Sequence, residues 1–214
     1  QVDENNKFNV NYALQVEEFT IQSIASTGMS VTVTPALRFN HVGAPDADTT
    51  PTVLSNGTKL LPHLGNLTRN IVIRSENPSG VRGHTLLTNR AVVDIRYVQY
   101  QDLGRTRAIP LDSTVITNGV VTSIGTNQIG RYPLHMHHVW GAPNPTNTGY
   151  QFTLIGNAIN DSLKWPMTLH GSHFGLVQQN VIFGGTQLTG AGLALEDGTE
   201  TENLIQENFI ANIR

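Results

Sequence analysis

Two short sequence patterns recur together in the second half of the chain, and they constrain its fold more than any other feature. The first reads P-L-H-M-H at 133–137, P-M-T-L-H at 166–170 and G-L-A-L-E at 192–196. The second reads L-I-G-N-A-I, V-Q-Q-N-V-I and I-Q-E-N-F-I, with aligned asparagines at Asn157, Asn180 and Asn208. Alternation of apolar and polar residues is typical of a strand with one buried face. Short strands that recur at this interval predict stacked coils of a parallel β-helix.

Alignment of the three copies assigns their side chains to two opposite faces of one sheet. The inward face would carry two apolar rows, Leu134, Met167, Leu193 and Met136, Leu169, Leu195. The outward face would carry His135, Thr168, Ala194 in one row and His137, His170, Glu196 in the other. Neighbouring rungs lie about 4.8 Å apart, so the outward face predicts a ladder of polar side chains. The asparagines would stand at a fixed corner, because asparagine tolerates a left-handed backbone.

The remaining sequence has the composition of an all-β protein. Only 14% of residues are charged and 38% are hydrophobic, and no stretch has a sustained period of 3.6. We therefore expect a right-handed parallel β-helix at 61–214, preceded by a short β-rich N-terminal cap at 1–60. The strands expected before the coils lie at 13–37, as a hairpin-like pair, and at 70–74, 84–87, 91–100 and 113–124, and turn-rich insertions lie at 141–149 and 184–190. Because the sequence ends inside an apparent coil, we expect a fragment of a longer protein.

Composition also argues against several kinds of partner. The net charge is −3 and the isoelectric point is about 6.2, which gives no electrostatic footprint for nucleic acid. Cysteine is absent, so the chain has no disulfide and no thiolate site. No apolar run approaches the roughly 20 residues of a membrane span. The oligomeric state is left open by the sequence.

The outward histidines predict a metal site. Imidazoles two apart on one strand, with a third on the next rung, can converge on one ion. We expect His135, His137 and His170 to bind one divalent transition metal, with Zn²⁺ favoured and Glu196 as a fourth ligand or as a partner of a ligand. The same histidines, with Glu196 and Asp197, are also the candidate catalytic residues, through metal-free acid–base chemistry if no ion binds. The alternative is a purely structural ladder that hydrogen-bonds between rungs.

His138 follows this pair directly. A regular strand would point its side chain inward, whereas a strand end would allow it to turn outward.

Several segments resemble a known family. They are L-T-R-N-I-V-I-R-S-E at 67–76, R-G-H at 82–84, D-I-R-Y-V-Q-Y-Q-D-L-G-R at 94–105, G-R-Y-P-L-H-M-H at 130–137 and L-E-D-G-T-E at 195–200. They resemble the secreted and cell-surface hyaluronan-degrading proteins, which carry an eight-glycine domain followed by parallel β-helix repeats, an arrangement shared by fibrocystin-type proteins. The segments E-E-F-T-I-Q-S-I and P-A-L-R-F-N-H-V-G resemble the end of the eight-glycine domain. This resemblance implies an extracellular or secreted β-helix, with a cell-surface location as one possibility, whose partner is a polysaccharide.

The candidate substrate-binding residues flank the ladder. Arg105 and Arg131 each follow a glycine, and a guanidinium can pair with a carboxylated sugar or simply with Asp102 or Asp112. Aromatic rings next to the ladder can stack on sugar faces or pack at strand ends; they belong to Tyr132, Trp140 and Trp165. Two functions therefore stay open. One is a hyaluronidase-like polysaccharide hydrolase or lyase, and the other is a non-catalytic carbohydrate-binding or adhesion β-helix with a structural metal or a polar histidine ladder.

Overall fold

The computed structural model describes residues 16–41, 45–47, 50–51, 57, 62–107, 114–123, 125, 128–140, 149–185 and 190–213. The chain divides into two compact units, residues 1–64 and 65–214, and each is described by itself. Within the described residues every regular element is a strand, and none is a helix long and apolar enough to cross a membrane. The predicted all-β class is confirmed. The boundary expected between residues 60 and 61 stays a prediction, and the insertions at 141–149 and 184–190 lie largely outside the described residues.

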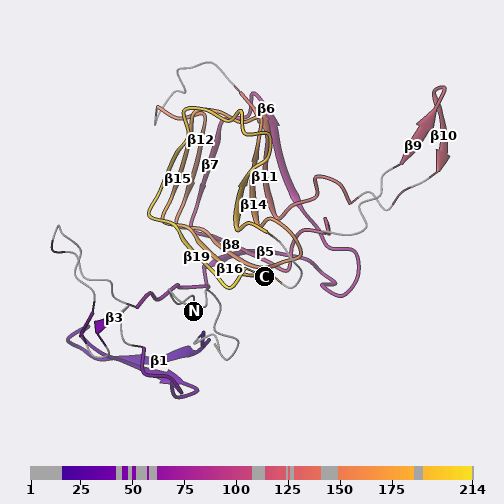
Figure 1. The fold of residues 1–214 in the computed structure, drawn as a ribbon. Coiled ribbons are helices and arrows are strands. Elements are labelled where there is room, and N and C mark those ends of the chain that lie inside the picture. The colour runs from indigo at the N-terminus through magenta and orange to yellow at the C-terminus, as the bar shows by residue number, and fades with distance from the viewer. Residues whose placement is uncertain are drawn as a thin grey trace. The chain divides into compact units, whose positions relative to one another are not determined.

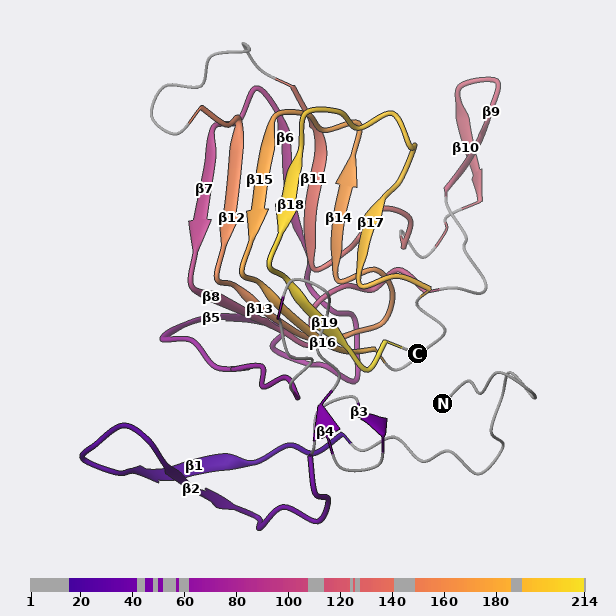
Figure 2. The same ribbon diagram turned by 60° about the vertical axis from the view of Figure 1, so that its left-hand side comes forward.

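The second unit is a stack of coils, each of which contributes one strand to each of three parallel sheets (Figures 1 and 2). Sheet 1 contains β6 (Thr85–Asn89), β11 (Leu134–Val139), β14 (Met167–His170) and β17 (Leu193–Leu195). Sheet 2 contains β7 (Val93–Arg96), β12 (Phe152–Ile155), β15 (Gly175–Gln178) and β18 (Leu204–Gln206). Sheet 3 contains β5 (Ile71–Arg74), β8 (Val98–Gln101), β13 (Ala158–Ser162), β16 (Val181–Gly185) and β19 (Phe209–Ala211). The predicted parallel β-helix is confirmed.

The register of sheet 1 is the one that the repeats predict. Leu134 pairs with Met167 and Met167 pairs with Leu193, and His137 pairs with His170. Leu134 and Met167 are fully buried in the core enclosed by the three sheets, and Leu193 is half-buried against it. Burial of apolar side chains drives this arrangement, at about 25 cal/mol per Å² of apolar surface removed from water. The outward histidines are consequently fixed on a rigid sheet.

The aligned asparagines form a ladder, but the predicted reason for their position is wrong. The left-handed backbone belongs to the preceding residues, Gly156, Gln179 and Glu207, which have φ of 64°, 55° and 57°. Each asparagine instead uses its side chain to join coils. The Oδ1 of Asn180 accepts hydrogen bonds from N (2.9 Å) and Nδ2 (3.0 Å) of Asn157, and the Oδ1 of Asn208 serves Asn180 in the same way. The turn therefore satisfies its buried backbone groups with a stacked amide row.

A segment that we call the strap, residues 65–69, crosses sheet 3. A Cβ on Gly65 would lie 2.7 Å from the ring of Phe209 in β19 and 2.9 Å from Val181 in β16. The carbonyl of Leu67 accepts a hydrogen bond from Asn160 Nδ2 in β13 (3.2 Å). At its other end, Arg69 N donates to Gln99 Oε1 in β8 (3.1 Å), and Arg69 Nε donates to the carbonyl of Gly156 (2.6 Å). One short segment therefore contacts a strand from each of four coils.

Two predicted strands differ from the structure because of left-handed residues. The run at 91–100 is divided into β7 and β8 by Tyr97, whose φ of 55° turns the chain from sheet 2 into sheet 3. The run at 113–124 is an antiparallel hairpin of β9 (Val115–Thr117) and β10 (Val120–Ser123). It turns at Asn118 and Gly119, which both have positive φ, as expected of an Asn-Gly turn.

The N-terminal unit contains the predicted strand pair. The strands β1 (Thr20–Ile24) and β2 (Val31–Thr34) are antiparallel, as are β3 (Pro45–Ala47) and β4 (Thr50–Pro51). The carboxylate of Glu17 accepts hydrogen bonds from Arg38 N (2.9 Å) and Phe39 N (3.0 Å). It also lies 2.9 Å from His41 Nε2. This carboxylate ties the chain that enters β1 to the chain that leaves β2.

Candidate metal centre

Three imidazoles meet on the outer face of sheet 1. His135 and His137 belong to β11 and His170 ends β14, and each of them offers a ring nitrogen within 4.8 Å of the others. The rings of His137 and His170 lie 4.7 Å apart between centroids, and those of His135 and His137 lie 5.0 Å apart. The period-two alternation of β11 and the pairing of His137 with His170 produce this cluster directly. The three residues are therefore close enough to hold one metal ion.

The protonation of His135 is fixed by the backbone. Its Nδ1 lies 2.9 Å from the carbonyl of Gly130, so Nδ1 carries the hydrogen and Nε2 carries the lone pair. That Nε2 is buried and has no hydrogen-bond partner within the described part of the chain. The side chain is 1% exposed, and burial lowers the pKa of His135 to about 4. His135 is consequently a neutral imidazole with an unused buried acceptor.

His137 and His170 face each other through like atoms. Their Nδ1 atoms are 3.0 Å apart, and the Nε2 of His170 lies 3.1 Å from Asp197 Oδ2. If the Nε2–H of His170 donates to Asp197, its Nδ1 holds a lone pair directed at His137. Burial, followed by the charges of His138 and His170, lowers the pKa of His137. The two Nδ1 atoms then either share one hydrogen or share one cation.

Glu196 continues the ladder beyond His170. Its backbone N donates to the carbonyl of Leu169 (2.9 Å), and its Oε2 lies 3.5 Å from His170 Nδ1. Its Oε1 accepts a hydrogen bond from the hydroxyl of Tyr132 (3.1 Å). The Oε2 atom is buried and lacks a hydrogen-bond partner among the described residues. The set of mutually close ligand atoms comprises the three histidines without Glu196, so its place as a fourth ligand stays a prediction.

The predicted aromatic residues occupy different environments. Tyr132 is 2% exposed and packs between His135, at 4.9 Å, and Trp165, at 5.4 Å. The Nζ atom of Lys164 lies 4.1 Å from the centroid of the Trp165 ring. Burial raises the pKa of Tyr132, whereas Trp165 is half-buried. Trp140, at the end of β11, is 51% exposed and is the best placed of the three for stacking.

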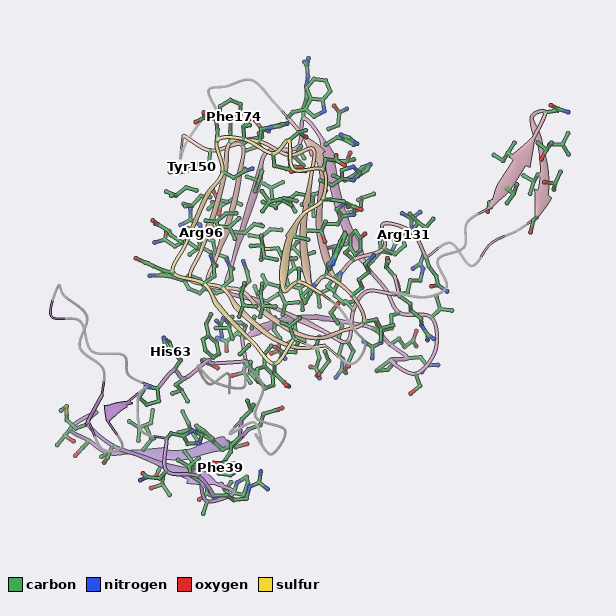
Figure 3. All side chains as sticks on the ribbon, in the orientation of Figure 1. Phe39, His63, Arg96, Arg131, Tyr150 and Phe174 are labelled. Atoms are coloured by element: carbon green, nitrogen blue, oxygen red, sulfur yellow. The ribbon has the colours of Figure 1, made fainter. Side chains whose placement is uncertain are left out.

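The two predicted arginines lie next to each other. The backbone N of Arg105 donates to the carbonyl of Arg131 (2.9 Å), and the Nη1 of Arg105 lies 3.1 Å from the carbonyl of Arg82 and 3.2 Å from His84 Nδ1. Figure 3 shows Arg131 outside the coil stack on the side of sheet 1. Asp102, one of the alternative partners, lies 3.8 Å from Arg82 Nη2. Asp112, the other, lies outside the described residues.

Two residues join the site that the sequence did not assign to it. His138 has a φ of 53° at a register shift in β11, so it turns outward, and its ring lies 4.4 Å from His137 and 4.6 Å from His170. Glu200 accepts hydrogen bonds from the backbone N of Gly171 (2.9 Å) and of Asp197 (3.2 Å). In the sequence, the only signal for His138 was its place next to His137, and the only signal for Glu200 was the E-D-G-T-E turn. The bulge that turns His138 outward and the contact of Glu200 with Gly171 both depend on a neighbouring coil, so they could not be predicted.

Comparison with known proteins agrees with the coil architecture. The sequence profile of the CEMIP β-helix family matches residues 107–214, just over half of the chain. The chain belongs to the CEMIP β-helix family. This membership confirms the resemblance that the sequence motifs indicated, and it covers the coils that carry the histidines.

Relatives of this CEMIP β-helix chain include much longer proteins. Fibrocystin-L of Mus musculus is 28% identical over 217 residues, which cover 90% of this chain and 5% of the relative. Fibrocystin-L of Homo sapiens is 26% identical over 216 residues, with the same coverage. The human cell surface hyaluronidase CEMIP2 is 26% identical over 198 residues, covering 91% of this chain and 13% of CEMIP2. The chain therefore spans a small part of these relatives. No solved structure gives a significant match.

Proposed function

We propose that the chain is an extracellular, polysaccharide-active β-helix that holds one divalent transition-metal ion between His135, His137 and His170. The observation that carries the metal proposal is the buried, unpartnered Nε2 of His135 within a cluster of three imidazoles. Leaving a buried polar atom unsatisfied costs about 1–3 kcal/mol. A cation would use that lone pair and would also relieve the opposition of the two Nδ1 atoms.

The donor set favours Zn²⁺. Neutral imidazoles suit a borderline ion, whereas Ca²⁺ and Mg²⁺ prefer oxygen ligands. The second buried acceptor, Glu196 Oε2, is our proposed fourth ligand. Ligating histidines commonly donate their other ring N–H to a carbonyl or a carboxylate, and the Gly130 carbonyl and Asp197 offer these acceptors to His135 and His170. With Glu196 as a fourth ligand the site would be closed and structural. With Glu196 outside the ligand set, the open position would hold a water that zinc, as a Lewis acid, would activate, and Glu196 and Asp197 would be the carboxylates that accept its proton.

The polysaccharide part of the proposal rests on the family and on the outer face of sheet 1. One relative is named a cell surface hyaluronidase, and the half-buried row of His137, His170 and Glu196 runs across successive coils, along which a chain of sugars would lie. Trp140 would stack on a ring, and Arg105 and Arg131 would meet a negatively charged group. The position of Glu196 Oε2, 3.5 Å from His170 Nδ1, favours the second candidate, a carbohydrate-binding module without chemistry, because a fourth protein ligand would leave no position for water on the ion.

Elemental analysis tests the metal proposal. We expect about one equivalent of zinc in protein purified without an affinity tag and loss of that zinc in His137→Ala. His173→Ala is the matched control, since His173 bonds to Thr201 and is not in the cluster. Acid should release the ion, because protons compete with the metal for the imidazole nitrogens. Substoichiometric metal in the wild type, unchanged in His137→Ala, would refute the proposal.

Incubation with hyaluronan, pectin and alginate tests the polysaccharide proposal. An enzyme shortens one of these chains, and His137→Ala abolishes the shortening. Binding without shortening, weakened by Trp140→Ala and Arg131→Ala, identifies the non-catalytic module instead. If the protein neither binds nor shortens any of the three polysaccharides, the polysaccharide proposal is refuted.

A further inference from the structure

The turn after β17, which we call the acidic turn (residues 196–200, E-D-G-T-E), contacts the site through a carboxylate that the proposed function leaves unused. Glu200 Oε1 accepts hydrogen bonds from Gly171 N (2.9 Å) and Asp197 N (3.2 Å). Gly171 follows His170 in the chain, and Asp197 lies 3.1 Å from the Nε2 of His170. Glu200 therefore holds two groups next to His170: the backbone of Gly171, which follows it in the chain, and Asp197, which contacts its ring.

We propose that Glu200 is a positioning residue of the metal centre, which holds Asp197 against His170 so that the Nδ1 lone pair of His170 faces His137. This inference rests on the proposed metal site and deepens it. Glu200 accepts hydrogen bonds from backbone groups beside the site and is not one of the three residues with mutually close ligand atoms, so its effect passes through the position of Asp197.

The reasoning begins with the tautomer of His170. A neutral imidazole has one N–H, and Nδ1 can serve as a ligand only when the hydrogen is on Nε2. An acceptor at Nε2 selects that form, and Asp197 Oδ2 is such an acceptor. However, the side chain of Asp197 is 44% exposed and lies in a turn, where an aspartate otherwise has several rotamers and solvent as a competing partner. A fixed backbone at Asp197 reduces that freedom.

Glu200 is suited to fix that backbone. Burial tends to raise its pKa, but hydrogen bonds from backbone N–H groups, including those of Gly171 and Asp197, outweigh burial and lower it, so the carboxylate is ionised at neutral pH. Ionised acceptors form stronger hydrogen bonds than neutral ones. The other partner, Gly171, has a φ of 52° at the point where the chain leaves β14. The same carboxylate thus pins the acidic turn of one coil to the strand end of the coil before it.

The test compares metal affinities by competition with a chromophoric chelator, for Zn²⁺ and for Co²⁺, whose visible absorption reports the ligand geometry. Loss of an outer hydrogen-bond partner of a ligating histidine typically weakens metal affinity about 10–100-fold. We expect a loss of this size in Glu200→Ala and a much smaller one in Glu200→Gln, because glutamine keeps an oxygen that can accept both N–H groups. If Glu200 acts through Asp197, the double variant with Asp197→Ala binds no more weakly than Asp197→Ala alone.

Glu207→Ala is the matched control. Glu207 lies in the same coil, is exposed and also joins two coils, through Gln178 Nε2 (3.1 Å) and Gln179 Nε2 (3.0 Å), but it is at the corner that follows β18. An equal loss of affinity in Glu207→Ala, or full additivity in the double variant, overturns the proposal. Glu200→Asp, whose shorter side chain cannot span both N–H groups, replaces Glu200→Ala if the latter does not fold. If Glu200→Ala and Glu200→Gln both bind metal as tightly as the unaltered protein, the positioning role alone is overturned. If the unaltered protein binds no metal, the proposed metal site is overturned as well.

Discussion

Replacement of Asn180 by alanine should be among the most destabilising single changes in the coils. The side chain is fully buried and lies in the middle of the amide row. Its Oδ1 accepts hydrogen bonds from N and Nδ2 of Asn157, and its Nδ2 donates to the Leu154 carbonyl (2.9 Å) and to Asn208 Oδ1 (2.9 Å). Asn180→Ala removes all four hydrogen bonds and leaves no room for bulk water to replace them.

The magnitude follows from which groups lose their partner. The backbone N–H of Asn157 is buried, and its loss of a partner costs about 2 kcal/mol, while each of the other three hydrogen bonds contributes about 1 kcal/mol. Because these bonds share atoms, their effects are not independent, and we expect a decrease of about 3–5 kcal/mol in the free energy of unfolding. This is a large share of the stability of an ordinary domain.

Urea denaturation followed by circular dichroism measures this difference. Asn208→Ala is the comparison, because Asn208 makes the same pattern of contacts to Asn180 but is half-buried. The groups that lose their partner, N and Nδ2 of Asn180, are buried, but truncation of the half-buried Asn208 opens a path for water to replace its oxygen, so we expect a loss of about 1 kcal/mol, the value of a typical hydrogen bond. If Asn180→Ala costs no more than Asn208→Ala, burial does not make the amide row important and the reasoning fails.

Three further changes have defined outcomes. Without metal, the wild type should lose up to about 3 kcal/mol of stability as the pH falls from about 6.5 to about 4. In this range His135 binds a proton in the unfolded chain, whereas burial holds its pKa in the folded protein at about 4. Urea titrations should show a smaller loss in His135→Gln. Burial tends to raise the pKa of Glu17, but the hydrogen bonds from Arg38 and Phe39 hold it at about 2 instead of 4.5. The N-terminal unit should therefore lose stability as the pH falls from about 4.5 to 2, and amide exchange in β1 and β2 should show no such loss in Glu17→Gln. Gly175→Ala places a Cβ against the ring of Phe152 and should cost about 1–3 kcal/mol in thermal or urea unfolding, a cost that Phe152→Leu should reduce.

The sequence predicted those features that depend on local periodicity. Alternation at 133–137 determined which side chains of β11 face the core, and alignment of the copies determined that His137 meets His170. Both follow from geometry that every strand shares, a period of two and a fixed rung spacing. The metal ion itself stays a prediction.

Features that depend on other coils could not be predicted. The outward face of β11 is not solvent-exposed at His135, because the loop through Gly130 and Tyr132 folds over it. That loop has no periodic pattern, and its position depends on Trp165 from the next coil. The residue that takes the left-handed backbone at the asparagine corner is glycine in one coil and glutamine or glutamate in others, so residue type alone did not identify it.

The strap has a consequence for how the coils come apart. In an array of stacked repeats each unit contacts only its neighbours, so unfolding can begin at either end and proceed one unit at a time. The strap contacts β8, β13, β16 and β19 together, so a strand among these four cannot detach without losing its contact with the strap. We therefore expect these four coils to unfold as a single cooperative unit rather than one at a time.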